Sequence, residues 1–269
     1  MERDAKELVQ KQFGRTAEEY VNSESHARGD DLERIVQWTQ PQGNWTALDI
    51  ATGGGHVAKT LAPHVRMVVA TDLTQPMLVA ARNHLVGADV LNCAYVLADA
   101  EKLPFLDDSF EIVVCRIAAH HFPSPQAFVT EAARVLKPGG RFVLIDNVIP
   151  EDAQLATFMN KVEHVRDHSH VRCLAVSEWK RLVERAGLHV AAERLNRKTH
   201  AVPSWARRAV ADEQQFAEVV HCLQTADELA QQYYSFTFAE FGERAGQVTT
   251  FQVDEWAALC VKTEPDQLG

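Results

Sequence analysis

Three aspartates stand at or near the ends of successive apolar segments in the first half of the chain. Asp49 lies in LDIATGGGHVA, Asp72 in RMVVATDL and Asp99 at the end of VLNCAYVLAD. A carboxylate inside an apolar segment is costly to bury unless it is hydrogen-bonded or paired. Beside a ligand, an ionised carboxylate can accept two hydrogen bonds, which suits the paired hydroxyls of a ribose. The three acids therefore predict a ligand site at the ends of three strands.

Three glycines, Gly53 to Gly55, follow the first of these segments directly. A turn without β-carbons lets the backbone approach a ligand closely, and the start of the following helix offers N–H groups without partners. Dinucleotide sites use the spacing G-x-G-x-x-G, whereas positions 56 and 58 are histidine and alanine. The turn therefore favours a ligand loop, and a nicotinamide oxidoreductase is the weaker alternative.

The apolar pattern predicts the elements that position these groups. Between residues 46 and 148, five short and continuous apolar runs alternate with stretches of helical periodicity. Continuous runs indicate strands buried on both faces, as in a parallel sheet covered by helices on each side. We therefore expect an α/β, Rossmann-like, doubly wound fold with a mostly parallel sheet.

The flanking regions follow a different pattern. Residues 3–40 predict helices, with an interruption near 22–30. After Pro150 we expect a helix within 151–172, a helix capped by Ser177 and followed by a strand, polar helices across 203–235, and a last strand at 255–263. The two late strands bring the expected sheet to seven.

Composition excludes several classes of function. The 269 residues carry a net charge of −10, which argues against nonspecific nucleic-acid binding, since that needs cationic patches. No apolar run approaches the roughly 20 residues of a membrane helix, and the amphipathic start lacks the apolar core of a secretory signal. We therefore expect a cytoplasmic protein without stable membrane association, either a monomer or a homodimer. The five cysteines form no C-x-x-C pair, so neither a disulfide framework nor a zinc site is predicted.

Four segments in order and spacing carry a resemblance to a known family. They are LDIATGGGHVA, VVATDLTQPMLVAAR, LADAEKLPFLDDSFEIVVCRIAAHHF and EAARVLKPGGRFVLID. Together they resemble the motifs of class I S-adenosylmethionine-dependent methyltransferases, in the type 11 group that includes menaquinone and ubiquinone biosynthesis methyltransferases. The resemblance covers about residues 10 to 195.

The resemblance implies which residues hold the methionine part of S-adenosylmethionine. The family's glycine loop falls on Ala51, Gly53 and Gly55, with Asp49 beneath it near the amino group of the cofactor. One departure is that Ala51 stands where the family has its first loop glycine. FGRTAEEY resembles an N-terminal segment that closes over the cofactor with a tyrosine, here Tyr20.

The resemblance also assigns the adenosine part. Asp72 would accept hydrogen bonds from the ribose hydroxyls, and Leu73 and Met77 would line the adenine. Asp99 would bind the adenine amino group, with the N–H of Ala100 on the ring.

Residues after the fourth predicted strand are expected to face both cofactor and acceptor. By resemblance, Arg116 and Ile117 border the two. His120 and His121 follow where open α/β sheets bind their ligands, and a neutral imidazole there can take a proton from an O–H, N–H or S–H nucleophile. His121 is the first candidate base and His120 the second. The alternative is that they only pack beneath a lid or shape a loop.

His164, His168 and His170 lie in or near the inserted helix. His164 and His168 are four residues apart and can share a helical face, as metal ligands do. No H-E-x-x-H motif is present, so no metal is predicted, and a polar substrate pocket or a solvated helix are the other interpretations.

The expected function is methyl transfer from S-adenosylmethionine to a small-molecule acceptor. A quinone-like lipid precursor as acceptor, and a non-catalytic S-adenosylmethionine-binding partner or regulatory protein, stay as alternatives. The expected domains are a helical segment at 1–45 that covers the cofactor and a methyltransferase domain at 46–269, with lid or substrate insertions around 150–175 and 203–250.

Overall fold

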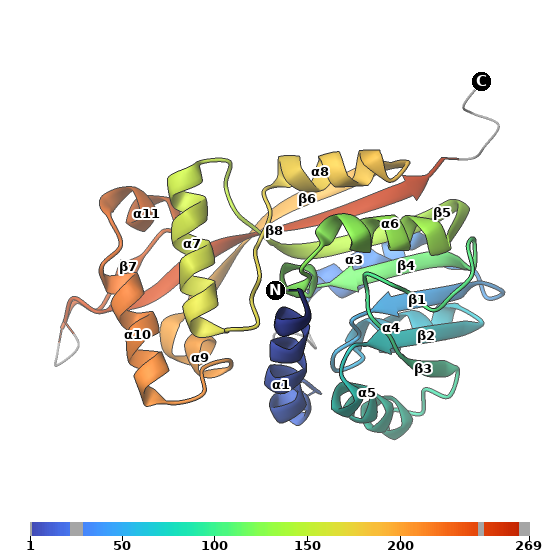
Figure 1. Cartoon of the computed structure of the whole chain (residues 1–269), viewed down its shortest axis with the longest axis horizontal. Coiled ribbons are helices and arrows are strands. Elements are labelled where there is room, and N and C mark those ends of the chain that lie inside the picture. Colours follow the sequence, from blue (N-terminus) through green and yellow to red (C-terminus); the bar gives the residue numbers. More distant parts are fainter. Residues whose placement is uncertain (1, 22–28, 242–244, 264–269) are drawn as a thin grey trace.

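The computed structural model describes residues 2–21, 29–241 and 245–263, and side chains for 4–14 and from 29 onward within these ranges. Within this part, seven strands form one sheet in the order β3-β2-β1-β4-β5-β8-β6, and the two-residue β7 pairs with β8 (Figure 1). The strands are β1 (Thr46–Ile50), β2 (Met67–Asp72), β3 (Cys93–Leu97), β4 (Phe110–Arg116), β5 (Leu136–Val148), β6 (Leu188–Ala201), β7 (Thr237–Phe238) and β8 (Val248–Lys262).

The first five strands are parallel, and β6, β7 and β8 pair antiparallel. The chain builds outward from β1 to β3 on one side and from β4 on the other, so the strand order reverses between β1 and β4. Open sheets of this kind bind ligands at the carboxyl ends of the strands beside that reversal. The expected Rossmann-like, mostly parallel sheet is confirmed, with β7 as a short addition.

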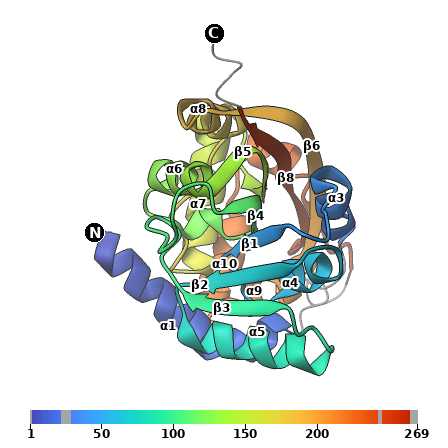
Figure 2. The same ribbon diagram turned by 90° about the vertical axis from the view of Figure 1, so that its right-hand side faces the viewer.

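Helices cover both faces of the sheet. Figure 2 shows α3 and α4 on one face and α6 and α8 on the other, with α1 beside α5 near the β3 edge. The helices are α1 (Glu2–Val21), α3 (Asp30–Thr39), α4 (His56–Leu61), α5 (Gln75–Gly87), α6 (Pro125–Val135), α7 (Ala153–Arg166), α8 (Val176–Arg185), α9 (Val202–Arg207), α10 (Glu213–Gln224) and α11 (Glu228–Tyr233), with 3-10 turns at Ala62–His64 and Ala119–His121.

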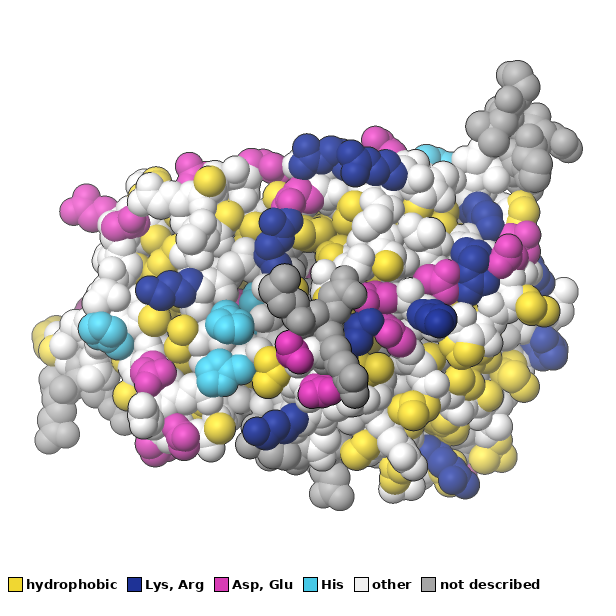
Figure 3. Space-filling model, in the orientation of Figure 1, with side chains coloured by type: hydrophobic (Ala, Val, Ile, Leu, Met, Phe, Trp, Pro, Cys, Tyr) yellow, Lys and Arg dark blue, Asp and Glu magenta, His cyan; other side chains and the backbone are white. Residues whose placement is uncertain are grey.

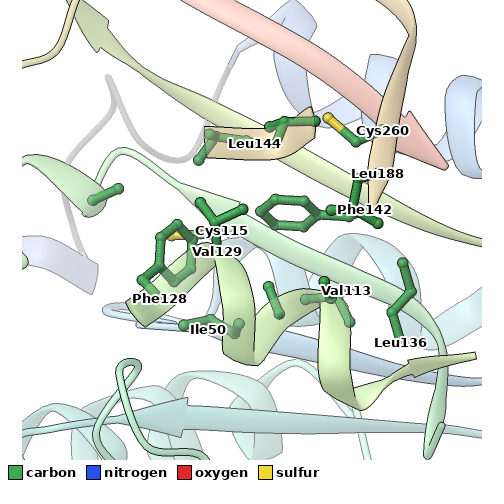
Figure 4. Close-up of a cluster of buried hydrophobic side chains, with 14 of the residues drawn as sticks. Ile50, Val113, Cys115, Phe128, Val129, Leu136, Phe142, Leu144, Leu188 and Cys260 are labelled. Carbon is green, nitrogen blue, oxygen red and sulfur yellow. The ribbon is translucent and has the colours of Figure 1, made fainter. Parts of the chain in front are cut away.

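The alternate residues of each central strand enter different cores, which is why the apolar runs are continuous. In β4, Val113 and Cys115 pack under Phe128 and Val129 of α6 (Figure 4), whereas Val114 joins the core beneath α3 and α4. Burial on both faces holds the strand ends rigidly, so that the loops after them have a fixed base.

A third core lies at the far ends of β6 and β8, beneath α7, α9, α10 and α11 (Figure 1). The last strand begins at Val248, not at residue 255 as the apolar run predicts. Residues 248–254 belong to the strand because they pair with β6 and β7, a long-range contact that the local pattern does not record.

The prediction that Ser177 caps a helix is wrong. The helix α8 begins at Val176, and the Glu178 carboxylate accepts the N–H of Ala175 at 2.9 Å. The Ser177 hydroxyl instead donates to Glu151 at 2.8 Å.

Candidate active site

A cavity of about 110 Å³ opens at the carboxyl ends of β1, β2 and β4, beside the glycine turn. Ten of the predicted cofactor residues and one predicted base line it. They are Asp49, Ala51, Gly53, Asp72, Leu73, Met77, Asp99, Ala100, Arg116, Ile117 and His121. Gly55 and His120 are not among its lining residues. Tyr20 lies in α1, and its side chain is outside the described part of the structure.

Asp49 is buried and holds the turn against the helix that follows. Its Oδ2 accepts the Thr52 hydroxyl at 2.6 Å and the N–H of Ala58 at 3.2 Å. Burial raises the pKa of Asp49 to about 7, although these two hydrogen bonds act in the opposite direction. Asp49 therefore belongs to a buried network and also lines the cavity.

The turn needs left-handed backbone at three positions. The φ angles are 54° at Ala51, 53° at Gly53 and 82° at Gly55. No atom lies within 4 Å of a β-carbon built on Gly53, so the space beside this glycine is open. A β-carbon on Gly55 would lie 3.2 Å from Leu85 Cδ1 and 3.4 Å from Ala81, so Gly55 serves the packing of α4 against α5.

Asp72 closes the turn from the neighbouring strand. Its Oδ2 accepts the N–H of Gly53 at 3.1 Å and its Oδ1 accepts the N–H of Thr74 at 2.9 Å. Burial raises the pKa of this carboxyl to about 6. Because a carboxylate offers about four acceptor positions, each oxygen retains capacity for a further donor.

Asp99 meets a cation from the N-terminal helix. Lys6 Nζ lies 2.6 Å from Asp99 Oδ2 and 2.5 Å from Glu101 Oε2. Gln10 of the same helix donates to the carbonyl oxygen of Leu73 at 3.1 Å. Lys6, Val9 and Phe13 all line the cavity, so α1 forms one of its walls.

Arg116 ends β4 and forms a buried ion pair. Its Nε lies 2.5 Å from Asp31 Oδ2 of α3. Burial alone would raise the pKa of Asp31, but the hydrogen bond and charge of Arg116 outweigh it and hold the pKa below its ordinary value. Ile117 follows with φ of 53°, a conformation that is strained for a β-branched residue.

His120 is held by a carboxylate at the end of β5. Its Nδ1 lies 2.6 Å from Asp146 Oδ1, and its backbone N–H donates to Asp146 Oδ2 at 2.8 Å. Burial alone would lower the pKa of His120, but the charge and hydrogen bond of Asp146 outweigh it and raise the pKa.

His121 lies against His120, with ring centroids 4.3 Å apart. Its Nδ1 lies 3.0 Å from the carbonyl oxygen of Ser169, which accepts only, so Nδ1 carries the proton when the ring is neutral. Burial, followed by the positive charge of His120, lowers the pKa of His121 to about 4. The neutral ring therefore keeps Nε2 as a proton acceptor.

The three later histidines separate into two groups. His170 is buried 5.6 Å from His120 between ring centroids, and its Nε2 lies 3.0 Å from Asn160 Oδ1. His164 and His168 are exposed, and Figure 3 shows histidine side chains on the surface at the end of α7. Among the described residues, no three His, Cys, Asp or Glu side chains are arranged as metal ligands. None of the described helices is long and apolar enough to span a bilayer.

A second cavity, of about 810 Å³, adjoins the first. Both are lined by Phe13, Ile117 and His121, whereas His120 lines only the second. His121 therefore stands at the junction of the two cavities. The arrangement can hold one ligand on each side of this residue.

Sequence reasoning missed four residues of the site, and each left a signal. Lys6 and Phe13 share a helical face with Val9, at spacings of three and four. Asp31 lies on the buried face of an amphipathic helix. Asp146 is a fourth acid near the end of an apolar strand, like the three aspartates that were recognised.

Comparisons with known proteins agree on one family. The chain matches the methyltransferase domain family over residues 48–144. It is 40% identical over 168 residues to the uncharacterised methyltransferase YcgJ of Bacillus subtilis, covering 62% of this chain and 66% of that protein. It is 37% identical over 123 residues to a demethylmenaquinone methyltransferase of Clavibacter sepedonicus, covering 45% of this chain and 49% of that protein. The chain thus spans about half to two thirds of these curated relatives.

A solved structure matches over greater length. A Bacillus halodurans protein described as a methyltransferase superposes with a TM-score of 0.83 at 38% identity, covering 87% of this chain and 100% of that one. The glycine turn and the three strand-end acids lie within residues 48–144, the stretch that matches the methyltransferase domain family. The chain therefore belongs to the class I S-adenosylmethionine-dependent methyltransferase family.

Proposed function

We propose that this protein transfers the methyl group of S-adenosylmethionine to a small-molecule acceptor. The observation that carries the proposal is that acids from the ends of three successive strands, Asp49, Asp72 and Asp99, line one cavity with the glycine turn. Family membership supports the use of this cofactor.

The donor set of the cavity fits an adenosyl ligand. Asp72 would hold the ribose hydroxyls with the acceptor positions that the backbone leaves, and Asp99 would bind the adenine amino group. Asp99 and Glu101 accept the Lys6 ammonium in this structure, which supports a role for them as acceptors of a nitrogen donor. Leu73 and Met77 would line the adenine.

Most of the remaining assignments concern residues that line the same cavity, whereas those of Gly55 and Tyr20 rest on the family resemblance alone. The N–H of Ala100 would bind the ring, and Ala51, Gly53 and Gly55 would form the loop around the methionine part. Arg116, Ile117 and Tyr20 would border the cofactor.

The N-terminal segment would cover the bound cofactor. The cavity volume of about 110 Å³ is below the roughly 300 Å³ of the smallest common ligand pockets. We therefore propose that α1 moves outward to admit the ligand and then closes, which excludes water. Residues 1–45 would act as this cover, and the insertions around 150–175 and 203–250 would form the acceptor side.

When bound, the cofactor would supply a methyl group to an in-line nucleophile, with the thioether of S-adenosylhomocysteine as the leaving group. The protein's own contribution is alignment, which is worth on the order of 7–11 kcal/mol in favourable cases, and proton removal where the nucleophile carries a proton. We propose His121 as the base, because it lines both cavities and its Nε2 is the unprotonated nitrogen. His120, which Asp146 orients, is the second candidate.

Two experiments test the function. Purified protein incubated with labelled S-adenosylmethionine and a metabolite extract is expected to yield a labelled small molecule, identified by mass spectrometry. Binding without turnover across extracts would instead favour the non-catalytic partner. A labelled quinone-like lipid would favour the activity named for the Clavibacter relative.

The second experiment tests the ribose assignment by calorimetry with S-adenosylhomocysteine. Asp72→Ala is expected to weaken binding far more than it alters thermal stability. Asp89→Asn is the control, because Asp89 is exposed and lies outside both cavities. Equal affinity of Asp72→Ala and the unaltered protein would remove the assignment.

A further inference from the structure

The second cavity has the size of a small-molecule site. Its volume of about 810 Å³ lies within the roughly 300–1,000 Å³ usual for such sites. It meets the first cavity at Phe13, Ile117 and His121. A ligand in it would therefore contact the residue that we propose as the base.

Cations outnumber acids in the walls of this cavity, in a chain whose net charge is −10: six arginine or lysine side chains line it with four acids, Asp30, Asp31, Asp167 and Glu255. The cationic residues come from four regions that are distant in sequence, and they are Arg34, Arg166, Arg194, Arg197, Lys198 and Arg208. Arg34 belongs to α3, near the start of the chain, whereas three of the others belong to β6, far along it. On β6, Arg194, Asn196, Lys198 and His200 occupy alternate positions, which is the spacing of one strand face.

Several of these cations already have carboxylate partners. Lys198 pairs with Glu255, which is itself buried in the wall. Arg166 Nε lies 3.0 Å from Glu163, and Arg197 Nε lies 3.1 Å from Asp254. These pairs hold the wall together and contribute little net charge.

Arg194 and Arg34 differ from these three cations. Arg194 Nε donates to the neutral amide oxygen of Asn196 at 2.8 Å. Arg34 Nη1 is buried, and no described residue accepts a hydrogen bond from it. The nearby acid Asp31 is already engaged by Arg116 at 2.5 Å. A buried charged donor without an acceptor is costly, and an anion bound beside it would remove that cost.

The titration of His200 supports a positive field in this cavity. Burial, followed by the charges of Arg208, Arg166 and Lys198, lowers the pKa of His200 to about 4. Cations from three elements thus act on one imidazole that lines the cavity. The same field would attract a negatively charged ligand.

We propose that the second cavity binds the methyl acceptor and that this acceptor carries a carboxylate or phosphate group, received by Arg34 and Arg194. This inference rests on the proposed methyl transfer. The charged group would lie among the arginines, and the nucleophilic atom would lie toward His121. Guanidinium groups suit both anions because their donors form a planar fork. An uncharged quinone-like lipid would leave Arg34 Nη1 without an acceptor.

Binding to the full chain tests the anion site without any need for turnover. The probes are benzoate and phenyl phosphate, with benzamide as the uncharged match for benzoate, followed by calorimetry or NMR. Both anions are expected to bind with a Kd about tenfold lower than that of benzamide, because charge-assisted hydrogen bonds are the stronger kind. The anion with the lower Kd identifies whether the acceptor carries a carboxylate or a phosphate group. Equal binding of benzoate and benzamide would overturn the proposal.

Substitutions locate the site. Arg34→Gln and Arg194→Gln are each expected to weaken anion binding by about fivefold or more, since each removes a charged donor. Arg194 is exposed, so its variant remains informative if Arg34→Gln fails to fold. Arg181→Gln is the matched control, because Arg181 is an exposed arginine of α8 outside both cavities. An equal loss of anion affinity in Arg181→Gln, or no loss of anion affinity in Arg194→Gln, would contradict the proposed location of the site.

Calorimetry with S-adenosylhomocysteine separates this inference from the proposed function. If S-adenosylhomocysteine binds but the two anions bind no more tightly than benzamide, the proposal of an anionic acceptor is wrong and the proposed methyl transfer stands. If the anions bind at the arginines but S-adenosylhomocysteine does not bind, the proposed methyl transfer is wrong. The role of the second cavity as an acceptor site is then wrong as well. A single-stranded oligonucleotide that binds more tightly than either anion, and loses affinity in the same variants, would make nucleic acid the ligand and overturn the proposal.

Discussion

The carboxylate of Asp146 holds His120 at two points, with Oδ1 2.6 Å from the ring Nδ1 and Oδ2 2.8 Å from the backbone nitrogen. This double contact fixes the His120 ring and also the 3-10 turn after β4 that carries it. Both are held against the end of β5, where Asp146 lies. It also keeps positive charge on His120, which is one reason why the pKa of the adjacent His121 is low. The two histidines therefore titrate in opposite directions from the ordinary imidazole.

The two imidazoles are expected to titrate in separate pH ranges. His121 should lose its proton at about pH 4, and His120 should lose its proton above the ordinary value of about 6.5. A base must be unprotonated, so activity through His121 would rise with pH across the lower range and be complete by neutrality. NMR of the imidazole C–H signals measures both, with His120→Gln and His121→Gln for assignment. A single shared titration near 6.5 would contradict the described environments.

Asp146→Asn is expected to move the two pKa values toward each other. Without the carboxylate, His120 loses its proton more easily, and His121 is then relieved of a neighbouring charge. If His121 is the base, the acidic limb of the pH–rate profile moves up; if His120 is the base, the limb moves down. Because either imidazole would still be largely unprotonated at neutral pH, activity there should change far less than the roughly 10²- to 10⁴-fold expected for removal of the base itself. Asp89→Asn should leave the profile unchanged.

Asp146→Asn should also lower the free energy of unfolding by an amount that depends on pH in a predictable direction. Because the pKa of His120 is raised in the fold, the pair stabilises the protein fully below the ordinary imidazole pKa of about 6.5. This contribution is lost as pH rises through the raised value. The destabilisation caused by Asp146→Asn should therefore be larger at about pH 6 than at about pH 9 in denaturant unfolding. A larger loss at the higher pH would contradict the assignment.

Lys6→Met is expected to speed the association of S-adenosylhomocysteine. The Lys6 ammonium bridges Asp99 and Glu101, so this contact must break before another nitrogen donor can bind there. A partly exposed ion pair contributes roughly 0.2–1 kcal/mol, which limits the increase to about fivefold. Stopped-flow fluorescence measures the rate constant. Lys11→Met, on an exposed lysine of the same helix, should show no increase, and a slower rate in Lys6→Met would contradict the competition.

Ala51→Gly is expected to stabilise the protein. The alanine has φ of 54°, where a β-carbon costs roughly 1–2 kcal/mol, and glycine removes that strain at an entropic cost of roughly 0.5–1 kcal/mol. The net gain of about 0.5–1 kcal/mol should raise Tm by about 1–3 °C for a chain of this size. Gly53→Ala, which adds the same strain at φ of 53°, should lower Tm. A lower Tm in Ala51→Gly would contradict this account.

The sequence alone determined the sheet and the edge of the sheet at which its three aspartates meet. Continuous apolar runs separated by helical stretches are compatible with few folds other than a doubly wound sheet. In a parallel sheet, the carboxyl ends of successive strands meet at one edge. The aspartates near the ends of β1, β2 and β3 therefore had to come together, and all three line one cavity.

Only the tertiary structure decided which distant side chains meet. Lys6 and Asp99 are separated by 93 positions, and Arg116 and Asp31 by 85. The cationic cavity forms because α3, which packs on β5 and β8, faces the same space as the antiparallel strand β6. The register of β6 against β8 sets which of its residues face inward. Local periodicity fixes the face on which a residue lies, whereas the packing of whole elements fixes which faces touch. The composition of the second cavity depends on that second step.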